Sequence, residues 1–137
     1  MLLIPNTEDV LVLRTDFSKD VKWHNLCAEI QTPDPEYGFQ PYVEFLSDQK
    51  FENLNSAEII DLLPADYSHP IIFVIDRYTV ESEESPVLCI DLYEDKGKEM
   101  RVLPKVMWAV ENNLSISNSE FSSFLESTDE NGIFREI

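Results

Sequence analysis

Glycine is scarce in this sequence of 137 residues, where it occurs only as Gly38, Gly97 and Gly132. A dinucleotide-binding fingerprint and a P-loop both need closely spaced glycines so that the backbone can approach phosphate, and neither motif can be assembled here. A nucleophile elbow is excluded as well, because no serine stands between two spaced glycines. The sequence therefore lacks the common phosphate-binding and serine-nucleophile motifs.

Basic residues are also few: 10 Lys and Arg oppose 27 Asp and Glu, giving a formal net charge of -17. Nucleic acids and anionic membranes bind proteins through Lys and Arg, so we expect neither as a partner. Between residues 29 and 66 the only basic residue is Lys50. The acids of this stretch are Glu29, Asp34, Glu36, Glu44, Asp48, Glu52, Glu58, Asp61 and Asp66. Such a surface attracts basic proteins or cations, although acidity can also serve only solubility.

Long apolar runs and a secretion signal are missing. The first five residues lack a basic region, and no apolar stretch approaches the roughly 20 residues of a membrane helix. We therefore expect a cytoplasmic protein, in which Cys27 and Cys89 are reduced, buried thiols. His24 and Cys27 can share one helical face, but adding His69 and Cys89 matches no zinc pattern. We predict no metal ion or other cofactor.

The hydrophobic fraction of 43% and the aromatic fraction of 11% are high enough for a folded core despite the charge. No repeat or linker divides the chain, so we predict a single domain over residues 1–137. Five segments rich in Val, Ile, Leu and aromatic residues are typical of strands: 9–17, 42–46, 70–76, 86–93 and 100–103. Residues 133–134 are either an edge strand or a docked tail.

Four helices are expected from apolar residues at helical spacing and from capping signals. Their predicted starts are Ser18, the Asn55–Glu58 capping box, Pro104 and the Ser117–Glu120 capping box. Strands and helices follow in mixed order. The fold class predicted is α/β (α+β), a single mixed β-sheet of about five strands covered by about four helices.

Three carboxylates, Asp16, Asp76 and Asp91, fall at or near the ends of predicted strands. Ligands of open α/β sheets bind at strand ends, and two or three converging carboxylates can hold Mg²⁺ or Ca²⁺ or share a proton. In the alternative, which we favour, Asp16 caps the next helix while the other two pair with arginines. The nearby arginines are Arg14, Arg77 and Arg101.

The segment Trp108 to Asn118 is the least generic part of the chain. On a helix, Trp108, Glu111 and Asn112 share one face, and an indole beside a carboxylate and an amide can form a small binding surface. Alternatively, Asn112 and Asn113 end the helix and shape the turn that follows. Both interpretations remain open at this point.

Four motifs in order carry a family resemblance: LRTDF (13–17), FVIDR (73–77), VLCIDLYED (87–95) and WAVENNLSISNSEF (108–121). With the GIFRE ending, the chain resembles an uncharacterised bacterial family, common in actinomycetes and known only as a domain of unknown function. The resemblance spans nearly the whole chain and implies a bacterial, single-domain, intracellular protein. Because the family has no assigned activity, it supplies no catalytic residues.

We consider two functions. The first, favoured one is a non-enzymatic interaction protein that binds a basic protein partner, most specifically an immunity protein that neutralises a cationic toxin. Its predicted binding residues are Trp108, Glu111, Asn112, Asn113, Glu36, Glu44, Asp48 and Glu52. The second is a divalent-metal-dependent enzyme or small-ligand module, which requires Asp16, Asp76 and Asp91 to converge. The sequence does not set the oligomeric state.

Overall fold

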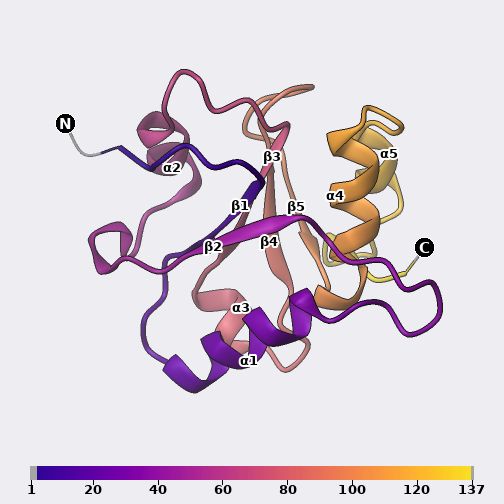
Figure 1. The fold of residues 1–137 in the computed structure, drawn as a ribbon, viewed down its shortest axis with the longest axis horizontal. Coiled ribbons are helices and arrows are strands. Elements are labelled where there is room, and N and C mark those ends of the chain that lie inside the picture. The colour runs from indigo at the N-terminus through magenta and orange to yellow at the C-terminus, as the bar shows by residue number, and fades with distance from the viewer. Residues whose placement is uncertain (1–2, 137) are drawn as a thin grey trace.

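The computed structural model describes residues 3–136 and contains one six-stranded mixed sheet (Figure 1). The strands are ordered β2-β1-β3-β4-β5-β6 across it. Their bounds are β1 (Val10–Arg14), β2 (Val43–Leu46), β3 (Ile71–Ile75), β4 (Val87–Asp91), β5 (Glu99–Val102) and β6 (Ile133–Phe134). The helices are α1 (Asp20–Gln31), α2 (Ser56–Leu62), α3 (Arg77–Glu81), α4 (Met107–Ser115) and α5 (Phe121–Glu126). Two short 3₁₀ helices are η1 (Gln49–Phe51) and η2 (Pro104–Val106).

One strand of the sheet, β4, runs opposite to its neighbours β3 and β5, and its direction decides which side chains share an edge. β1, β2 and β3 run parallel, whereas β4 is antiparallel to both β3 and β5, and β6 is parallel to β5. The register pairs Ile71, the first residue of β3, with Asp91, the last residue of β4. The amino ends of the three parallel strands and the carboxyl end of β4 therefore lie at one edge of the sheet.

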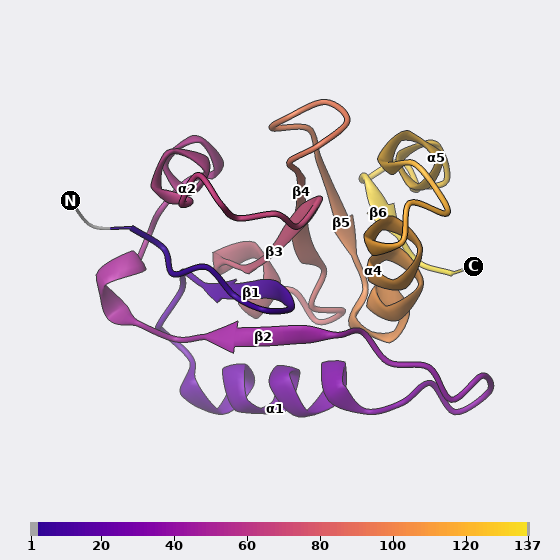
Figure 2. The ribbon, with the colours of Figure 1, turned by 45° about the horizontal axis from the view of Figure 1, so that its top comes forward.

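Helices cover both faces of the sheet (Figure 2). Because side chains alternate along a strand, Val10 and Val12 of β1 point to one core while Leu11 and Leu13 point to the other. The first core includes residues of α1, α4 and α5, and the second includes residues of η1 and α2. Every residue of β1, β3 and β4 is buried, as the apolar runs in these strands predict for a sheet covered on both sides.

The predicted mixed sheet with helical cover is confirmed, with one strand and one helix more than expected. Residues 133–134 form an edge strand rather than only a docked tail. The additional helix is α3, whose start is fixed by Asp76, since its carboxylate accepts a hydrogen bond from the Thr79 amide. No helix within residues 3–136 combines the length and the apolar character needed to cross a bilayer.

Helix starts were predicted correctly at two places and wrongly at two. The Asn55–Glu58 capping box is present in both directions, and Pro104 opens the turn before α4. Ser18 does not cap α1, because its amide and hydroxyl both donate to Asp16, and the cap position falls to Lys19. Ser117 does not cap α5 either.

Ser117 does not cap α5 because it is part of the turn that ends α4. Its amide donates to the Leu114 carbonyl in the turn that ends α4, and its φ of 58° is left-handed. The residue thus belongs to the end of one helix and cannot start the next. α5 begins only at Phe121, after Glu120 at the cap position, which makes no side-chain cap.

Candidate functional site

The three strand-end carboxylates do not converge. Asp16 and Asp76 follow the carboxyl ends of the parallel strands β1 and β3. Asp91 lies at the opposite edge of the sheet, because β4 runs antiparallel to β3. The metal hypothesis requires the three carboxylates to converge, and this expectation is wrong for Asp91. The physical reason is the direction of β4.

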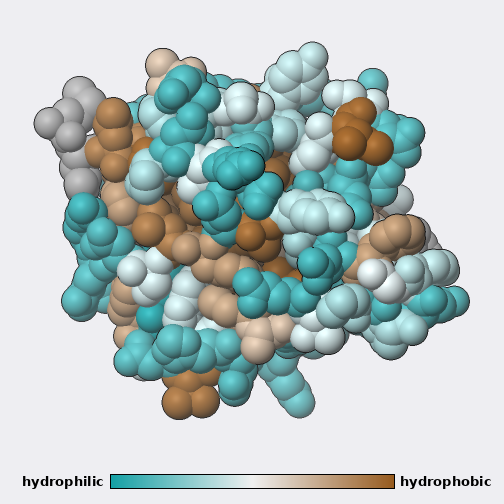
Figure 3. Space-filling model, viewed as in Figure 1, coloured by the Kyte–Doolittle hydropathy of each residue, from teal (hydrophilic) through white to brown (hydrophobic). Residues whose placement is uncertain are grey.

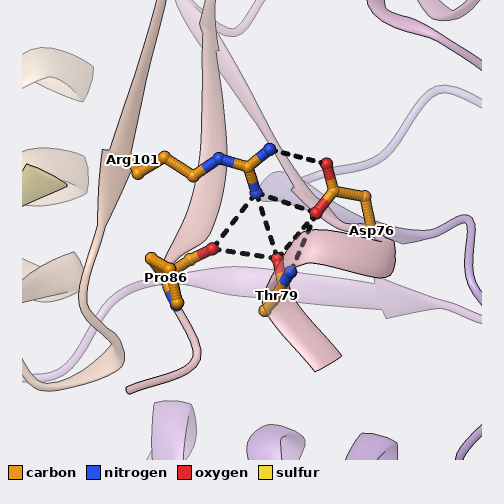
Figure 4. A network of polar contacts seen from close by, with 4 residues as sticks. All are labelled: Asp76, Thr79, Pro86 and Arg101. Carbon is orange, nitrogen blue, oxygen red and sulfur yellow. Dashed lines mark hydrogen bonds and ion pairs between the residues drawn. The ribbon is translucent and has the colours of Figure 1, made fainter. Parts of the chain in front are cut away.

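Asp76 is the acceptor in a compact polar network (Figure 4). Arg101 donates to both of its oxygens at 2.8 Å, and the amide and hydroxyl of Thr79 donate at 3.1 and 3.0 Å. Arg101 also donates to the Pro86 carbonyl and lies 4.6 Å from the ring centre of Tyr78. Burial opposes ionisation of Asp76, but the hydrogen bonds and charge of Arg101 outweigh it and hold the pKa of this carboxyl below its ordinary value. The contacts are those of a structural ion pair that ties β5 to the start of α3.

The other two carboxylates organise the backbone around them. Asp16 accepts from the Ser18 amide instead of capping α1. Asp91, which is buried, accepts from the amides of Tyr93, Glu94 and Asp95 and so shapes the turn after β4. The expectation that Asp91 pairs with an arginine is wrong, because three backbone amides supply its hydrogen bonds instead.

The cysteine and histidine side chains considered for zinc are dispersed. Cys27 and Cys89 are both free, and burial raises the pKa of the Cys27 thiol to about 11 and also raises that of Cys89. His24 is exposed on α1, whereas His69 precedes β3. Within residues 3–136 no three or more His, Cys, Asp or Glu side chains are grouped so that they could hold a metal ion.

Trp108, Glu111 and Asn112 share one face of α4 as predicted, and that face contacts the loop of residues 32–42. Glu111 is 3% exposed and accepts from the Tyr42 amide at 2.7 Å. It also accepts from the side chains of Asn112 at 2.8 Å and Ser115 at 2.6 Å. Asn112 in turn donates to the Gln40 carbonyl at 3.3 Å. The buried carboxylate thus fixes the loop against the helix.

Trp108 packs against two aromatic residues of the same loop. Its ring centre lies 5.7 Å from that of Tyr37 and 5.2 Å from that of Phe39. The indole N–H of Trp108 is buried and has no hydrogen-bond acceptor within residues 3–136. An unpaired buried donor costs free energy, which the surrounding ring contacts have to offset.

Asn113 has the structural role that was the alternative for this segment. Its side-chain amide donates to the Ala109 carbonyl at 2.7 Å, and its side-chain oxygen accepts from Asn118 at 2.8 Å. These bonds shape the end of α4 and the turn after it.

The other four acids predicted as binding residues are spread over the 32–42 loop, β2 and η1. Glu36 lies in the 32–42 loop beside Tyr37, and Glu44 on β2 accepts from the Asp9 amide at 2.7 Å. Asp48 caps η1, and Glu52 is an exposed residue at the end of η1. Only Glu36 is a neighbour in sequence of the residues that pack on Trp108.

Two hollows meet at the sheet edge where the parallel strands begin. They enclose about 580 Å³ and about 430 Å³, and both are lined by His69 and Ser115. The first lies between the starts of β3 and α5 and the end of β4, and the second between the starts of β1 and β2 and the end of α4. In Figure 1 the start of β3 and the end of α4 are both close to the top of the molecule. We call the two hollows together the acidic furrow.

The name reflects the charge of the lining. No Lys or Arg occurs among the described residues that line the acidic furrow. Its acids are Glu8, Asp9, Asp91, Glu94, Glu111 and Glu120. Glu8, Glu94 and Glu120 are exposed, whereas Asp91 and Glu111 are buried and engaged in the hydrogen bonds described above. Asp9 is half-buried, so the three exposed carboxylates are the most accessible to an incoming cation.

Two tyrosines and an isoleucine complete the chemistry of the acidic furrow. Tyr67 donates to the Ile71 carbonyl at 3.0 Å, and burial raises the pKa of its phenol well above the ordinary value, which keeps it neutral. Tyr93 and Ile116 are 85% and 73% exposed at the rim. Figure 3 shows a hydrophobic spot next to hydrophilic residues over the end of α4. An anionic hollow with apolar side chains at its rim can bind a cationic segment of another protein.

Sequence reasoning missed most of the acidic furrow. Glu8, His69, Glu94 and Glu120 are far apart in the chain, and no motif in the sequence relates them to one another. The signal that could have found them is topological, since three parallel strand starts and one antiparallel strand end share an edge.

The mixed sheet and the acidic furrow at its edge define an acidic α+β domain. The family model described as Domain of unknown function (DUF6924) matches residues 9–137, and the chain belongs to that family. This confirms the expected membership of an uncharacterised family. Searches of curated proteins and of solved structures found no match.

Proposed function

We propose that this protein is a cytoplasmic interaction protein that binds a basic protein partner in the acidic furrow. The observation that carries the proposal is the acidic furrow, which is lined by six acids and, in the part of the chain described, by no Lys or Arg. The net charge of -17 adds a long-range field that attracts a cationic partner before contact. The specific form of the proposal is an immunity protein that neutralises a cationic toxin.

Apolar contact gives such a partner more than a charge to recognise. Tyr93 and Ile116 at the rim, with Tyr42 at 62% exposure, offer surface that a bound chain can cover. Tyrosine supplies large contact area at low conformational cost, which is why it is enriched in protein interfaces. Charge then sets the association rate, and burial of these side chains slows dissociation.

The test separates the effect of where the negative charges lie from the effect of how many there are. The variant Glu8→Gln/Glu94→Gln/Glu120→Gln removes the exposed charges of the acidic furrow, and Glu83→Gln/Glu126→Gln/Glu130→Gln removes as many exposed charges elsewhere. An octa-arginine peptide labelled with a fluorophore serves as the probe, and its Kd is measured by polarisation at low and high salt. We expect the furrow variant to bind about tenfold more weakly, since exposed ion pairs contribute up to about 1 kcal/mol each, while the matched control changes much less.

Binding to the unmodified protein should also weaken steeply as salt rises, because exposed charges are screened. Equal losses in the two variants would contradict the proposal, since they would show attraction to the net charge alone. The natural partner is then sought by retention on the tagged protein from host extract at low salt. Its binding has to show the same difference between the two variants.

A further inference from the structure

Beside the acidic furrow lies a group of aromatic rings formed by Tyr37, Phe39 and Trp108, which we call the aromatic platform. Tyr37 and Phe39 are 54% and 53% exposed, although both contact Trp108. The rings of Tyr37 and Phe39 are tilted to that of Trp108 by 48° and 32°, between stacked and edge-on packing. Half-exposed rings held in a fixed arrangement are a surface on which a partner can stack.

The loop that carries the aromatic platform is well ordered by its own hydrogen bonds. The Asp34 carboxylate accepts from the amides of Glu36 and Tyr37 at 3.0 and 2.8 Å. The Gly38 amide donates to the Asp34 carbonyl at 2.7 Å. Gly38 has a φ of 75°, a left-handed conformation that glycine adopts without strain and that places one aromatic residue on each side of the turn. A preformed surface loses little conformational entropy when it binds.

The aromatic platform adjoins the acidic furrow through the residues that hold its loop. Tyr42, at the end of the same loop, lines the furrow, and so do Glu111 and Asn112, which hold that loop in place. A chain bound in the furrow can therefore extend over the rings. This proximity links the two surfaces to one partner.

No cation of this protein occupies the aromatic platform in the residues that the structure describes. Elsewhere the chain stacks its own cations on rings: Arg14 lies 4.4 Å from the ring centre of Phe17, and Arg101 4.6 Å from that of Tyr78. Residues 32–42 and 107–118, which build the platform and its support, contain no Lys or Arg. They do contain Asp34 and Glu36, so the surroundings favour an external cation.

We infer that the aromatic platform binds arginine side chains of the basic partner, in preference to lysine side chains. This rests on the proposed function, because the partner is the one held in the acidic furrow. The guanidinium group is planar and weakly hydrated and stacks on aromatic faces, whereas the lysine ammonium is compact and strongly hydrated. The rings thus account for the preference for arginine over lysine. The carboxylates account for the general attraction to cations.

The experiment compares octa-arginine with octa-lysine, two peptides of equal charge and length. The quantity measured is the Kd for octa-lysine divided by the Kd for octa-arginine. In the variant Tyr37→Leu/Phe39→Leu, which keeps apolar side chains but removes two rings, we expect this ratio to fall about fivefold. The aromatic control Tyr37→Phe/Phe39→Tyr should keep the ratio of the unmodified protein. Circular dichroism first establishes that each variant is folded, because an unfolded chain of net charge -17 would bind both peptides without ring contacts.

The outcome also separates this inference from the proposed function. The furrow variant Glu8→Gln/Glu94→Gln/Glu120→Gln should weaken both peptides and leave the ratio unchanged. An unchanged ratio in the leucine variant, with the furrow variant still weakened, would overturn the arginine site and leave the proposed function standing. If the furrow variant binds as well as its matched control, the proposed function fails regardless of the ratio.

Discussion

Replacing Asp76 with alanine is expected to lower the free energy of unfolding by about 3 kcal/mol. The substitution leaves Arg101 without its bidentate partner in a site where its side chain is only 21% exposed. It also removes the acceptor for the Thr79 amide at the start of α3. Denaturant unfolding of the purified protein measures the change.

The matched control is Glu81→Ala. Glu81 also pairs with an arginine, Arg77, but the two side chains are 52% and 79% exposed. Exposed ion pairs contribute little, so the control should lose less than about 1 kcal/mol. If the two variants are equally stable, the network around Asp76 contributes no more than a surface pair, and the structural role given to it is wrong.

The same pair predicts how stability depends on pH. The pKa of Asp76 is lower in the folded protein than in the unfolded chain, where aspartate side chains titrate at about 3.9. Its ionised form therefore stabilises the fold above that pH, and the stabilisation is lost as pH falls through the folded-state pKa. We expect the stability difference between the unmodified protein and Asp76→Ala to be constant near neutrality and to shrink below about pH 4. A difference that grows on acidification would contradict this.

Strand positions were predictable because a buried strand has a recognisable pattern of apolar residues in the sequence. Segments such as residues 71–75 are apolar at every position, as a strand covered on both faces requires, and are too short for a buried helix. The Asn55–Glu58 box was predictable for a similar reason, since both of its hydrogen bonds are local. Where the determinants lie within a few residues of one another, the sequence was sufficient.

Strand direction was the main feature missed, and it displaced the expected site. A parallel pair needs a crossover of a dozen or more residues, whereas only residues 76–86 join β3 to β4. The short connection makes β4 antiparallel and carries Asp91 to the edge opposite Asp76. The hollow consequently lies where the parallel strands begin, and its exposed acids come from segments that no local pattern relates.

The burial of Glu111 could not be anticipated from the helix alone. Its spacing from Trp108 and Asn112 predicted a shared face, and that face exists. It contacts the 32–42 loop because the chain entering β2 carries an amide, that of Tyr42, which needs an acceptor. The predicted face of α4 thus contacts the protein's own 32–42 loop, and that loop carries two of the three rings of the aromatic platform.

Replacing Glu111 with alanine is therefore expected to release this loop and to lower the free energy of unfolding by about 2 to 3 kcal/mol. The Tyr42 amide loses its acceptor, and Asn112 and Ser115 lose theirs. Hydrogen exchange at the Tyr42 amide should accelerate more than exchange in the central strands.

The variant Glu111→Gln distinguishes loss of the acceptor from loss of the charge. Glutamine keeps an oxygen that can accept from the Tyr42 amide, so its exchange should stay closer to that of the unmodified protein. The preference for octa-arginine over octa-lysine should fall more in Glu111→Ala than in Glu111→Gln, because this loop positions the rings of Tyr37 and Phe39. If exchange at Tyr42 is unchanged in the alanine variant, the contacts of the rings with Trp108 hold the loop by themselves, and the carboxylate is not what orders it.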